Sequence, residues 1–135
     1  MIYGIGTDVV EVSRIQATYE RFGDHFSSRL LLPEEYAAFT RYKRKVRFLA
    51  MRFAAKEALV KAMGTGFANG MWIRDVGIVS DPKGKPLVIF SERGDTLRRE
   101  LGIGESHVSL TDEAGLVVAM AIMERALTDE GGRSA

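Results

Sequence analysis

The chain has 135 residues, of which 46% are hydrophobic and 27% charged, and it contains no cysteine. A chain of this length can bury enough apolar surface to fold as one domain, and the lack of cysteine excludes a disulfide framework, a thiolate metal site and a cysteine nucleophile. Its 19 lysine and arginine residues nearly balance its 18 aspartate and glutamate residues, so net charge alone indicates neither a nucleic acid nor a membrane as partner.

The first predicted element is a strand over residues 2–10, in which alternate side chains point to the same face. Gly4, Gly6 and Asp8 therefore share one face, and two glycines beside a carboxylate leave room there for a close neighbour. Because glycine in a strand admits either a ligand or another backbone, this pattern leaves open whether the face is functional or a crowded crossing of two elements.

Two short helices are predicted next. Ser13 and Gln16 match a capping box, so the first helix begins just after Ser13 and ends at Gly23. Pro33 begins the second helix, because proline is favoured at the first helical position, and the basic run 41–45 ends it.

The strongest helical signal covers residues 46–63 and ends at Gly64, since glycine suits a left-handed helix cap. Alanine recurs at every fourth position from Ala50 to Ala62, which makes a narrow stripe for close packing. Glu57 and Lys61 are four residues apart and can meet on one face of this helix. Taken alone, such a pair is more often a solvated salt bridge than part of a functional site.

The C-terminal half is predicted to consist mainly of strands. The expected elements are strands at 72–80 and 87–90, a helix at 91–101, and strands at 107–111 and 116–124. Glycine and proline in the segment 81–86 predict that the first two strands form a hairpin. A second turn is expected at 112–115.

Residues 1–126 are expected to form the single domain, and residues 127–135 a flexible C-terminal tail, because the last residues are polar and contain glycine. The longest uninterrupted apolar run, Leu116–Met123, is far shorter than the roughly 20 residues of a membrane-spanning helix. The N-terminus also lacks the basic and apolar pattern of a signal peptide. We therefore expect a cytoplasmic protein with no membrane partner.

Without reference to any family, the residues most suited to chemistry are Asp8, Glu57, Lys61 and His107, although their spacing does not bring them together. If the long helix packed on the first strand, Asp8 and Glu57 would face each other. Two carboxylates with open remaining positions suit Mg²⁺, which takes phosphate oxygens as further ligands. The basic side chains that could then serve a polyphosphate ligand are Lys43, Arg44, Lys61 and Lys83.

Five short motifs follow one another within residues 1–125: Ile5–Val12, Arg52–Ala58 with Lys61 and Ala62, Gly64–Gly66, Gly84–Pro86 and His107–Thr111. This ordered set resembles the signatures of the holo-acyl-carrier-protein synthases, the small single-unit branch of the 4'-phosphopantetheinyl transferases. The resemblance implies an α+β fold, the 4'-phosphopantetheinyl transferase-like fold, in which a long helix packs on a mainly antiparallel sheet. It also implies transfer of the 4'-phosphopantetheine group from coenzyme A to a serine of acyl carrier protein, which supports fatty acid biosynthesis.

The resemblance further assigns roles to particular positions. Asp8 and Glu57 would hold Mg²⁺, or alternatively Mn²⁺, against the coenzyme A pyrophosphate. Glu57, Lys61 and His107 are the candidate catalytic residues: Lys61 places a positive charge beside the transferred phosphate, and either Glu57 or His107 takes the serine proton. The candidate coenzyme A-binding residues are Arg44, Arg52, Lys61, Gly64, Gly66, Lys83, Gly84, Lys85, Pro86 and His107.

The partners implied by the resemblance are coenzyme A, an acidic acyl carrier protein and further copies of the same chain. Arg14 and Arg21, two turns apart on the first predicted helix, are the expected carrier-protein-binding residues. The chain is expected to form a homotrimer with its sites between subunits, and to bind no nucleic acid.

Two alternatives stay open. The carrier could belong to a polyketide or peptide synthase rather than to fatty acid synthesis. Alternatively, the run Arg41–Lys45, with four basic residues around Tyr42, could bind nucleic acid by backbone contacts and aromatic stacking. A basic helix end is, however, also what the helix dipole favours.

Overall fold

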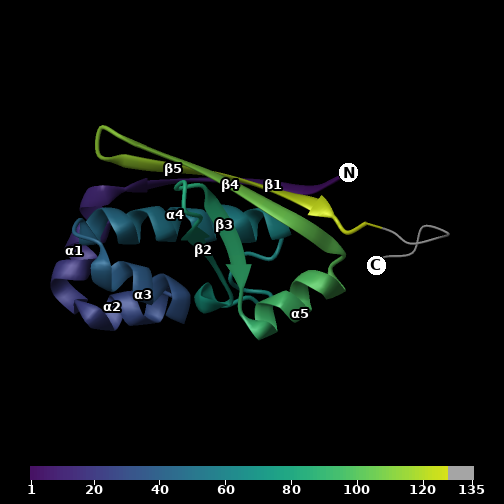
Figure 1. Cartoon of the computed structure of the whole chain (residues 1–135), viewed down its shortest axis with the longest axis horizontal. Coiled ribbons are helices and arrows are strands. Elements are labelled where there is room, and N and C mark those ends of the chain that lie inside the picture. Colours follow the sequence, from purple (N-terminus) through teal and green to yellow (C-terminus); the bar gives the residue numbers. More distant parts are fainter. Residues whose placement is uncertain (128–135) are drawn as a thin grey trace.

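The centre of the fold is a three-stranded antiparallel sheet with one long helix packed against it (Figure 1). The computed structural model describes residues 1–127, so the predicted tail, apart from its first residue, lies outside the described residues. The elements are β1 (Ile2–Glu11), α1 (Val12–Phe22), α2 (Asp24–Leu30), α3 (Pro33–Arg41), α4 (Lys45–Met63), the 3-10 helix η1 (Ile73–Asp75), β2 (Val76–Ser80), β3 (Pro86–Phe90), α5 (Glu92–Glu100), β4 (Ile103–Glu113) and β5 (Leu116–Arg125). The predicted α+β class is confirmed.

The main sheet has the strand order β1-β5-β4, so β5 is central and β1 and β4 are its edges. Along β5, Val117, Ala119, Ala121 and Met123 are fully buried, whereas Val118 and Met120 are exposed. This alternation separates an inner face covered by α4 from an outer face, which we define as the face away from α4. The second sheet is the β2–β3 hairpin, as expected from its turn. None of the helices described is both long and apolar enough to cross a membrane.

The inner face of β1 meets α4 at backbone distance. A Cβ atom added to Gly4 would lie 1.9 Å from the carbonyl oxygen of Ala62, and one added to Gly6 would lie 2.0 Å from that of Ala58. The two glycines therefore serve the crossing of a strand and a helix, and the alanine stripe predicted on α4 supplies the other side of the contact. This finding decides between the two interpretations that the sequence left open for this face of the strand.

A buried ion pair joins α3, α4 and β2 on the other side of α4. The side chains of Glu35 and Lys56 are both fully buried, with Lys56 Nζ 2.7 Å from Glu35 Oε1. The same carboxylate accepts hydrogen bonds from the backbone N–H groups of Leu32 and Ile78, and Lys56 also donates to the carbonyl oxygen of Val76. Because both charges are compensated by bonds to the backbone, this pair holds the β2–β3 hairpin against α4.

Three local expectations were wrong. The first helix begins at Val12 and its N-cap, Glu11, makes no side-chain bond, so the capping box predicted at Ser13 does not form. Helix α2 was not predicted, because it has only two turns and directly follows Gly23, which the sequence analysis used only as a helix end. Residues 72–75 are a 3-10 turn rather than a strand, because the Asp75 carboxylate accepts from the Trp72 backbone N–H at 2.8 Å.

The close contact between β1 and α4 predicts a large effect of a single methyl group. We expect Gly6→Ala to lower the free energy of unfolding by about 2–3 kcal/mol, because its Cβ would collide with backbone rather than with a movable side chain. Urea denaturation measures this change. The matched control is Thr7→Ala, next to it but exposed, which should cost about 1 kcal/mol or less; equal losses for the two variants would contradict the packing argument.

Candidate functional site

The contact between β1 and α4 brings Asp8, Glu57 and Lys61 together, and we call these three residues the carboxylate site. Asp8 follows Gly6 on the inner face of β1, where it is mostly shielded from solvent. Lys61 Nζ donates to the carbonyl oxygen of Thr7 at 2.9 Å and to Asp8 Oδ1 at 3.2 Å. The partner of Lys61 is therefore Asp8 across two elements, and not Glu57 one turn before it on the same helix.

Glu57 is electrostatically unusual. Burial raises the pKa of its carboxyl group above the ordinary value of 4.5, the negative charge of Asp8 raises it further, and Lys61 partly opposes both effects. Two carboxylates in this position repel each other unless a proton or a cation is shared between them. The donor set, two oxygen ligands with open positions around them, fits a hard divalent cation such as Mg²⁺.

A second feature is a cleft of about 890 Å³ between α3, the start of α4, the β2–β3 turn and β4. We call it the basic cleft, because Arg41, Arg47, Arg52 and Lys85 line it against a single acidic residue, Glu34. Of the predicted coenzyme A-binding residues, those that line it are Arg52, Gly84, Lys85 and Pro86. Its charge and size suit an anionic ligand of nucleotide type.

Arg52 is the most constrained cation of the basic cleft. Its guanidinium lies over the ring of Phe48, 4.1 Å from the centroid, and its Nε is 3.5 Å from Glu35 Oε2. The side chain is buried, and its Nε has no hydrogen-bond partner. Burial lowers the pKa of Arg52, against the opposing charge of Glu35. A guanidinium that lines the cleft is suited to a phosphate or carboxylate ligand there, although Nε itself is buried beside Glu35.

Asp81 shapes the turn at the mouth of the basic cleft. Its Oδ1 accepts hydrogen bonds from the backbone N–H groups of Lys83 and Lys85, at 2.8 and 2.9 Å, and Gly84 between them has a φ of +88°. The turn predicted from its glycine and prolines is thus rigid. Lys83 itself is exposed and is not among the residues that line the cleft.

The other predicted site residues lie apart from the basic cleft. Arg44 is exposed at the N-cap of α4. Gly64 and Gly66, both with positive φ, turn the chain after α4, just beyond Lys61 and so next to the carboxylate site. Arg14 and Arg21 are both exposed on α1, where no described element covers them.

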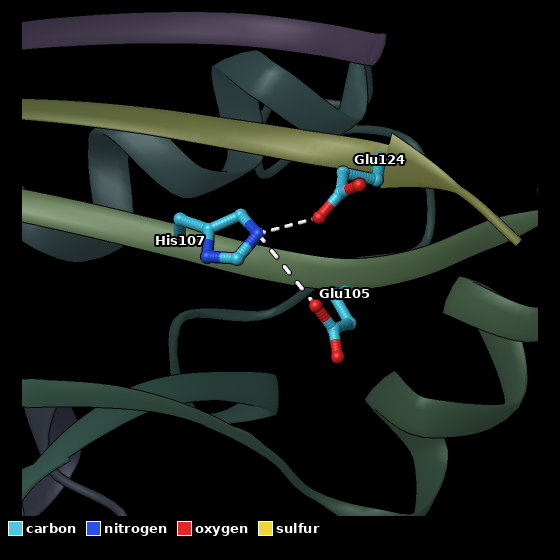
Figure 2. A group of neighbouring side chains, drawn as sticks. All are labelled: Glu105, His107 and Glu124. Carbon is cyan, nitrogen blue, oxygen red and sulfur yellow. Dashed lines mark hydrogen bonds and ion pairs between the residues drawn. The ribbon is translucent and has the colours of Figure 1, made fainter. Parts of the chain in front are cut away.

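His107 lies on the outer face of the sheet (Figure 2). Its Nε2 is 2.7 Å from Glu124 Oε2 and 3.9 Å from Glu105 Oε2. Within the described part of the chain, these three are the one group of at least three histidine or acidic residues whose ligand atoms lie within 4.8 Å of one another. The group is solvent-exposed and its imidazole nitrogen is already bonded to Glu124, so we interpret it as a hydrogen-bonded pair with a neighbouring carboxylate.

One chain therefore does not assemble all the predicted site residues. Arg52 and Glu57 are five positions apart on α4, which places them about 140° apart around its axis. Asp8 belongs to the edge strand β1, whereas the basic cleft reaches Val108–Leu110 on the opposite edge strand β4. His107 is also on β4, but on the outer face. The sheet and α4 thus separate the carboxylate site from both the basic cleft and His107.

The sequence analysis did not assign Arg47 to the site, although the structure places it in the basic cleft. Arg47 donates to the hydroxyl of Tyr42 at 2.7 Å and forms an ion pair with Asp112. Its place just after Arg41 and Tyr42, which also line the cleft, was a signal that could have indicated it. Lys45, by contrast, lies over the ring of Phe39 at 4.6 Å. The basic run proposed as a nucleic-acid contact therefore contributes Arg41 and Tyr42 to the cleft.

Comparison with known proteins identifies the family of the chain. A family model described as the 4'-phosphopantetheinyl transferase superfamily matches residues 4–121. The chain is 45% identical over 123 residues to a holo-[acyl-carrier-protein] synthase of Yersinia pestis (strain Pestoides F), covering 91% of this chain and 98% of the relative. The crystal structure of the holo-[acyl-carrier-protein] synthase from Neisseria meningitidis superimposes with a TM-score of 0.88 at 41% identity, covering 93% and 100% of the two chains. That of Helicobacter pylori in complex with coenzyme A has a TM-score of 0.78 at 30% identity, covering 89% and 99%.

The electrostatics of the carboxylate site can be tested by titration. Asp8→Asn is expected to lower the pKa of Glu57 toward the ordinary glutamate value, because it removes a negative charge that disfavours ionisation. Carbon-13 NMR of the Glu57 carboxyl group in metal-free buffer measures the pKa. The control is Asp112→Asn, which removes an exposed carboxylate paired with Arg47; a pKa of Glu57 that is the same in both variants would contradict the interaction.

The raised pKa of Glu57 also sets the sign of a stability effect. Below pH 4.5 protonation of Glu57 stabilises the folded state relative to the unfolded state. Between pH 4.5 and the higher pKa of the folded state only the folded state keeps this proton, so the stabilisation is lost as the pH rises through the folded-state pKa. We expect Glu57→Gln to remove this part of the pH dependence. Urea denaturation of both proteins across the acidic range measures the difference.

Proposed function

Because the chain belongs to the 4'-phosphopantetheinyl transferase superfamily, and within it to the holo-[acyl-carrier-protein] synthases, we propose that it transfers 4'-phosphopantetheine from coenzyme A to a serine of apo acyl carrier protein. The serine oxygen attacks the phosphorus nearer the pantetheine, and the bond to the bridging oxygen of the pyrophosphate breaks. Adenosine 3',5'-bisphosphate leaves. The observation that carries this proposal is the carboxylate site, where α4 and β1 place two carboxylates and a lysine together.

Asp8 and Glu57 would hold Mg²⁺, with Mn²⁺ as an alternative of similar ligand preference. Burial and the charge of Asp8 both raise the pKa of Glu57, and a divalent cation held by the two carboxylates would relieve the repulsion between them. When bound, such an ion neutralises charge on the pyrophosphate oxygens. Phosphoryl transfer depends mainly on such neutralisation and on positioning, with little covalent chemistry left for the protein.

In this proposal either Glu57 or His107 takes the serine proton. Glu57 is the first candidate, because it belongs to the carboxylate site and lies on helix α4 rather than in a loop. Lys61 is half-exposed and its present partner is Asp8, so its ammonium group can add positive charge beside the transferred phosphate. Gly64 and Gly66 follow directly and leave this end of the site open to the coenzyme.

The basic cleft would bind the nucleotide end of coenzyme A. Arg52, which lines the cleft, would contact its phosphates through the guanidinium, and Arg44, exposed at the N-cap of the same helix outside the cleft, would be a second cation. The turn at Gly84, Lys85 and Pro86 would lie under the adenine, with Lys83 beside it. The complex of the Helicobacter pylori relative with coenzyme A supports this ligand.

The complete site would lie between two copies of the chain, because α4 and the sheet separate its parts within one copy. The outer face of the sheet carries exposed apolar side chains on neighbouring strands, namely Val9 opposite Val118, with Met120 two residues further along β5. A second copy covering this face would bring His107 and the basic cleft of one chain toward the carboxylate site of another. We propose that three copies close into a homotrimer, as the sequence resemblance implies.

Arg14 and Arg21 on α1 are the proposed contacts for an acidic acyl carrier protein. Helix α1 follows β1 without a loop, so its arginines are held close to the strand that carries Asp8. Exposed charges of this kind govern the association rate and its salt dependence more than the final affinity. The proposed setting is fatty acid biosynthesis in the cytoplasm.

The transfer reaction is tested by mass spectrometry of apo acyl carrier protein incubated with the enzyme, coenzyme A and Mg²⁺. We expect a mass increase of one phosphopantetheine group, and its loss when a chelator removes the metal. Asp8→Asn and Glu57→Gln should each slow the reaction by about 100-fold or more. Glu92→Gln, which changes an exposed carboxylate on α5 outside both the carboxylate site and the basic cleft, should retain the wild-type rate. No mass increase with the wild-type enzyme would refute the proposed function.

The shared site is tested by the mass of the protein in solution. Light scattering after size exclusion should give three times the mass of one chain. Val118→Asp should give the mass of one chain and little activity, while circular dichroism shows a folded protein, because Val118 is exposed on the outer face of a single chain. Trp72→Lys, which changes an exposed apolar residue away from the sheet, should leave the trimer intact. A wild-type mass of one chain would refute the shared site.

A further inference from the structure

The outer-face group around His107 is not explained by the predicted site alone, because its closest contact is with a residue that has no assigned role. Nε2 of His107 lies 2.7 Å from Oε2 of Glu124, within hydrogen-bond distance (Figure 2). Glu105, the other carboxylate, is 3.9 Å away and far more exposed than Glu124. His107 therefore has one specific partner and one loose neighbour.

Two neighbouring strands of the main sheet carry this pair. His107 is on the edge strand β4, opposite Ile122 of the central strand β5, and Glu124 is two residues further along β5 on the same outer face. Such diagonal neighbours on adjacent strands are within reach of long side chains. The end of β5 is also tied to the N-terminus of the chain, since the Arg125 N–H donates to the carbonyl oxygen of Met1 at 2.7 Å. Glu124 is thus presented by a well-anchored strand.

The chemistry of the two groups determines which nitrogen of His107 is engaged. An ionised carboxylate only accepts hydrogen bonds, so Nε2 must carry the proton of this bond. The hydrogen bond from His107 lowers the pKa of the Glu124 carboxyl group, which favours the ionised form. The other nitrogen, Nδ1, points away from both carboxylates (Figure 2).

We propose that Glu124 is a positioning residue for His107, which accepts the bond from Nε2–H and so leaves Nδ1 as the nitrogen that meets the substrate. The role of Glu124 rests on the proposed function, because it acts only through His107. By fixing both the ring orientation and the tautomer, Glu124 makes Nδ1 available either to contact a coenzyme A phosphate or to accept the serine proton. Glu105 takes no part in this arrangement.

The first test measures the pair itself and is independent of activity. Carbon-13 NMR titration should give a pKa of the Glu124 carboxyl below the ordinary glutamate value of 4.5 in the wild type, and a return toward that value in His107→Ala. An unchanged pKa of Glu124 in His107→Ala would overturn the proposal, whatever the protein catalyses.

The second test is a double-mutant cycle on kcat/KM for coenzyme A. Glu124→Ala should lower kcat/KM by about tenfold, and Glu124→Gln by less, because an amide oxygen can still accept from Nε2–H. The Asn side chain of His107→Asn places its amide where Nδ1 was but does not extend to the position of Nε2. In this background, Glu124→Ala should change kcat/KM by less than about twofold.

The matched control is Glu105→Gln, which should keep the wild-type kcat/KM. Equal losses from Glu124→Ala in both backgrounds would mean that Glu124 acts on β5 rather than on His107, and would overturn the proposal. If the wild-type enzyme transfers no phosphopantetheine, the proposed function fails, and the NMR titration then decides the pairing of Glu124 with His107 by itself.

Discussion

The backbone of α4 lies against β1 at a distance that only glycine permits, and the carboxylate site depends on this contact. With any side chain at Gly4 or Gly6, a carbon atom would stand about 2 Å from a carbonyl oxygen of the helix. The contact fixes the rotation of α4 relative to the strand. As a result Lys61 reaches Asp8, and burial together with the charge of Asp8 raises the pKa of Glu57. The packing of two elements thus creates the chemistry of the site.

On the opposite side of α4, the buried pair of Glu35 and Lys56 fixes how the neighbouring elements pack. Two charges without solvent are stable only when they are paired and hydrogen-bonded, and here the backbone groups of Leu32, Ile78 and Val76 complete the set. This arrangement fixes the β2–β3 hairpin beside α4. The same carboxylate lies 3.5 Å from Nε of Arg52 and so also helps to hold that side chain, which lines the basic cleft.

The charged side chains of the nearly neutral chain are therefore segregated on different faces of the domain. Carboxylates gather where α4 meets β1, cations line the cleft on the other flank, and a histidine with its carboxylate partner occupies the outer face. In the proposed oligomer, opposite charges held on separate faces of one small domain would favour contacts between copies. A domain of this size also has little surface on which to enclose a coenzyme and a protein substrate by itself.

The sequence by itself determined most of the elements and named the candidate site residues. Alternation along β1 placed Gly4, Gly6 and Asp8 on one face, and the run 46–63 with Gly64 identified α4 almost to the residue. The ordered motifs indicated the family that the comparisons then confirmed. Local rules were less successful at Ser13, in α2 and at residues 72–75, where a backbone bond or a single carboxylate decided the geometry.

Only the tertiary structure decided which of these residues meet. Sequence spacing suggested a pair between Glu57 and Lys61, but the strand laid against α4 offers Lys61 a better partner in Asp8. It also could not show that His107 lies on the outer face with Glu124, because their contact depends on the register between β4 and β5. Helix periodicity and strand alternation are local properties of the chain, whereas partners across elements are set by how those elements pack, and that is why the site could be named from the sequence but not assembled from it.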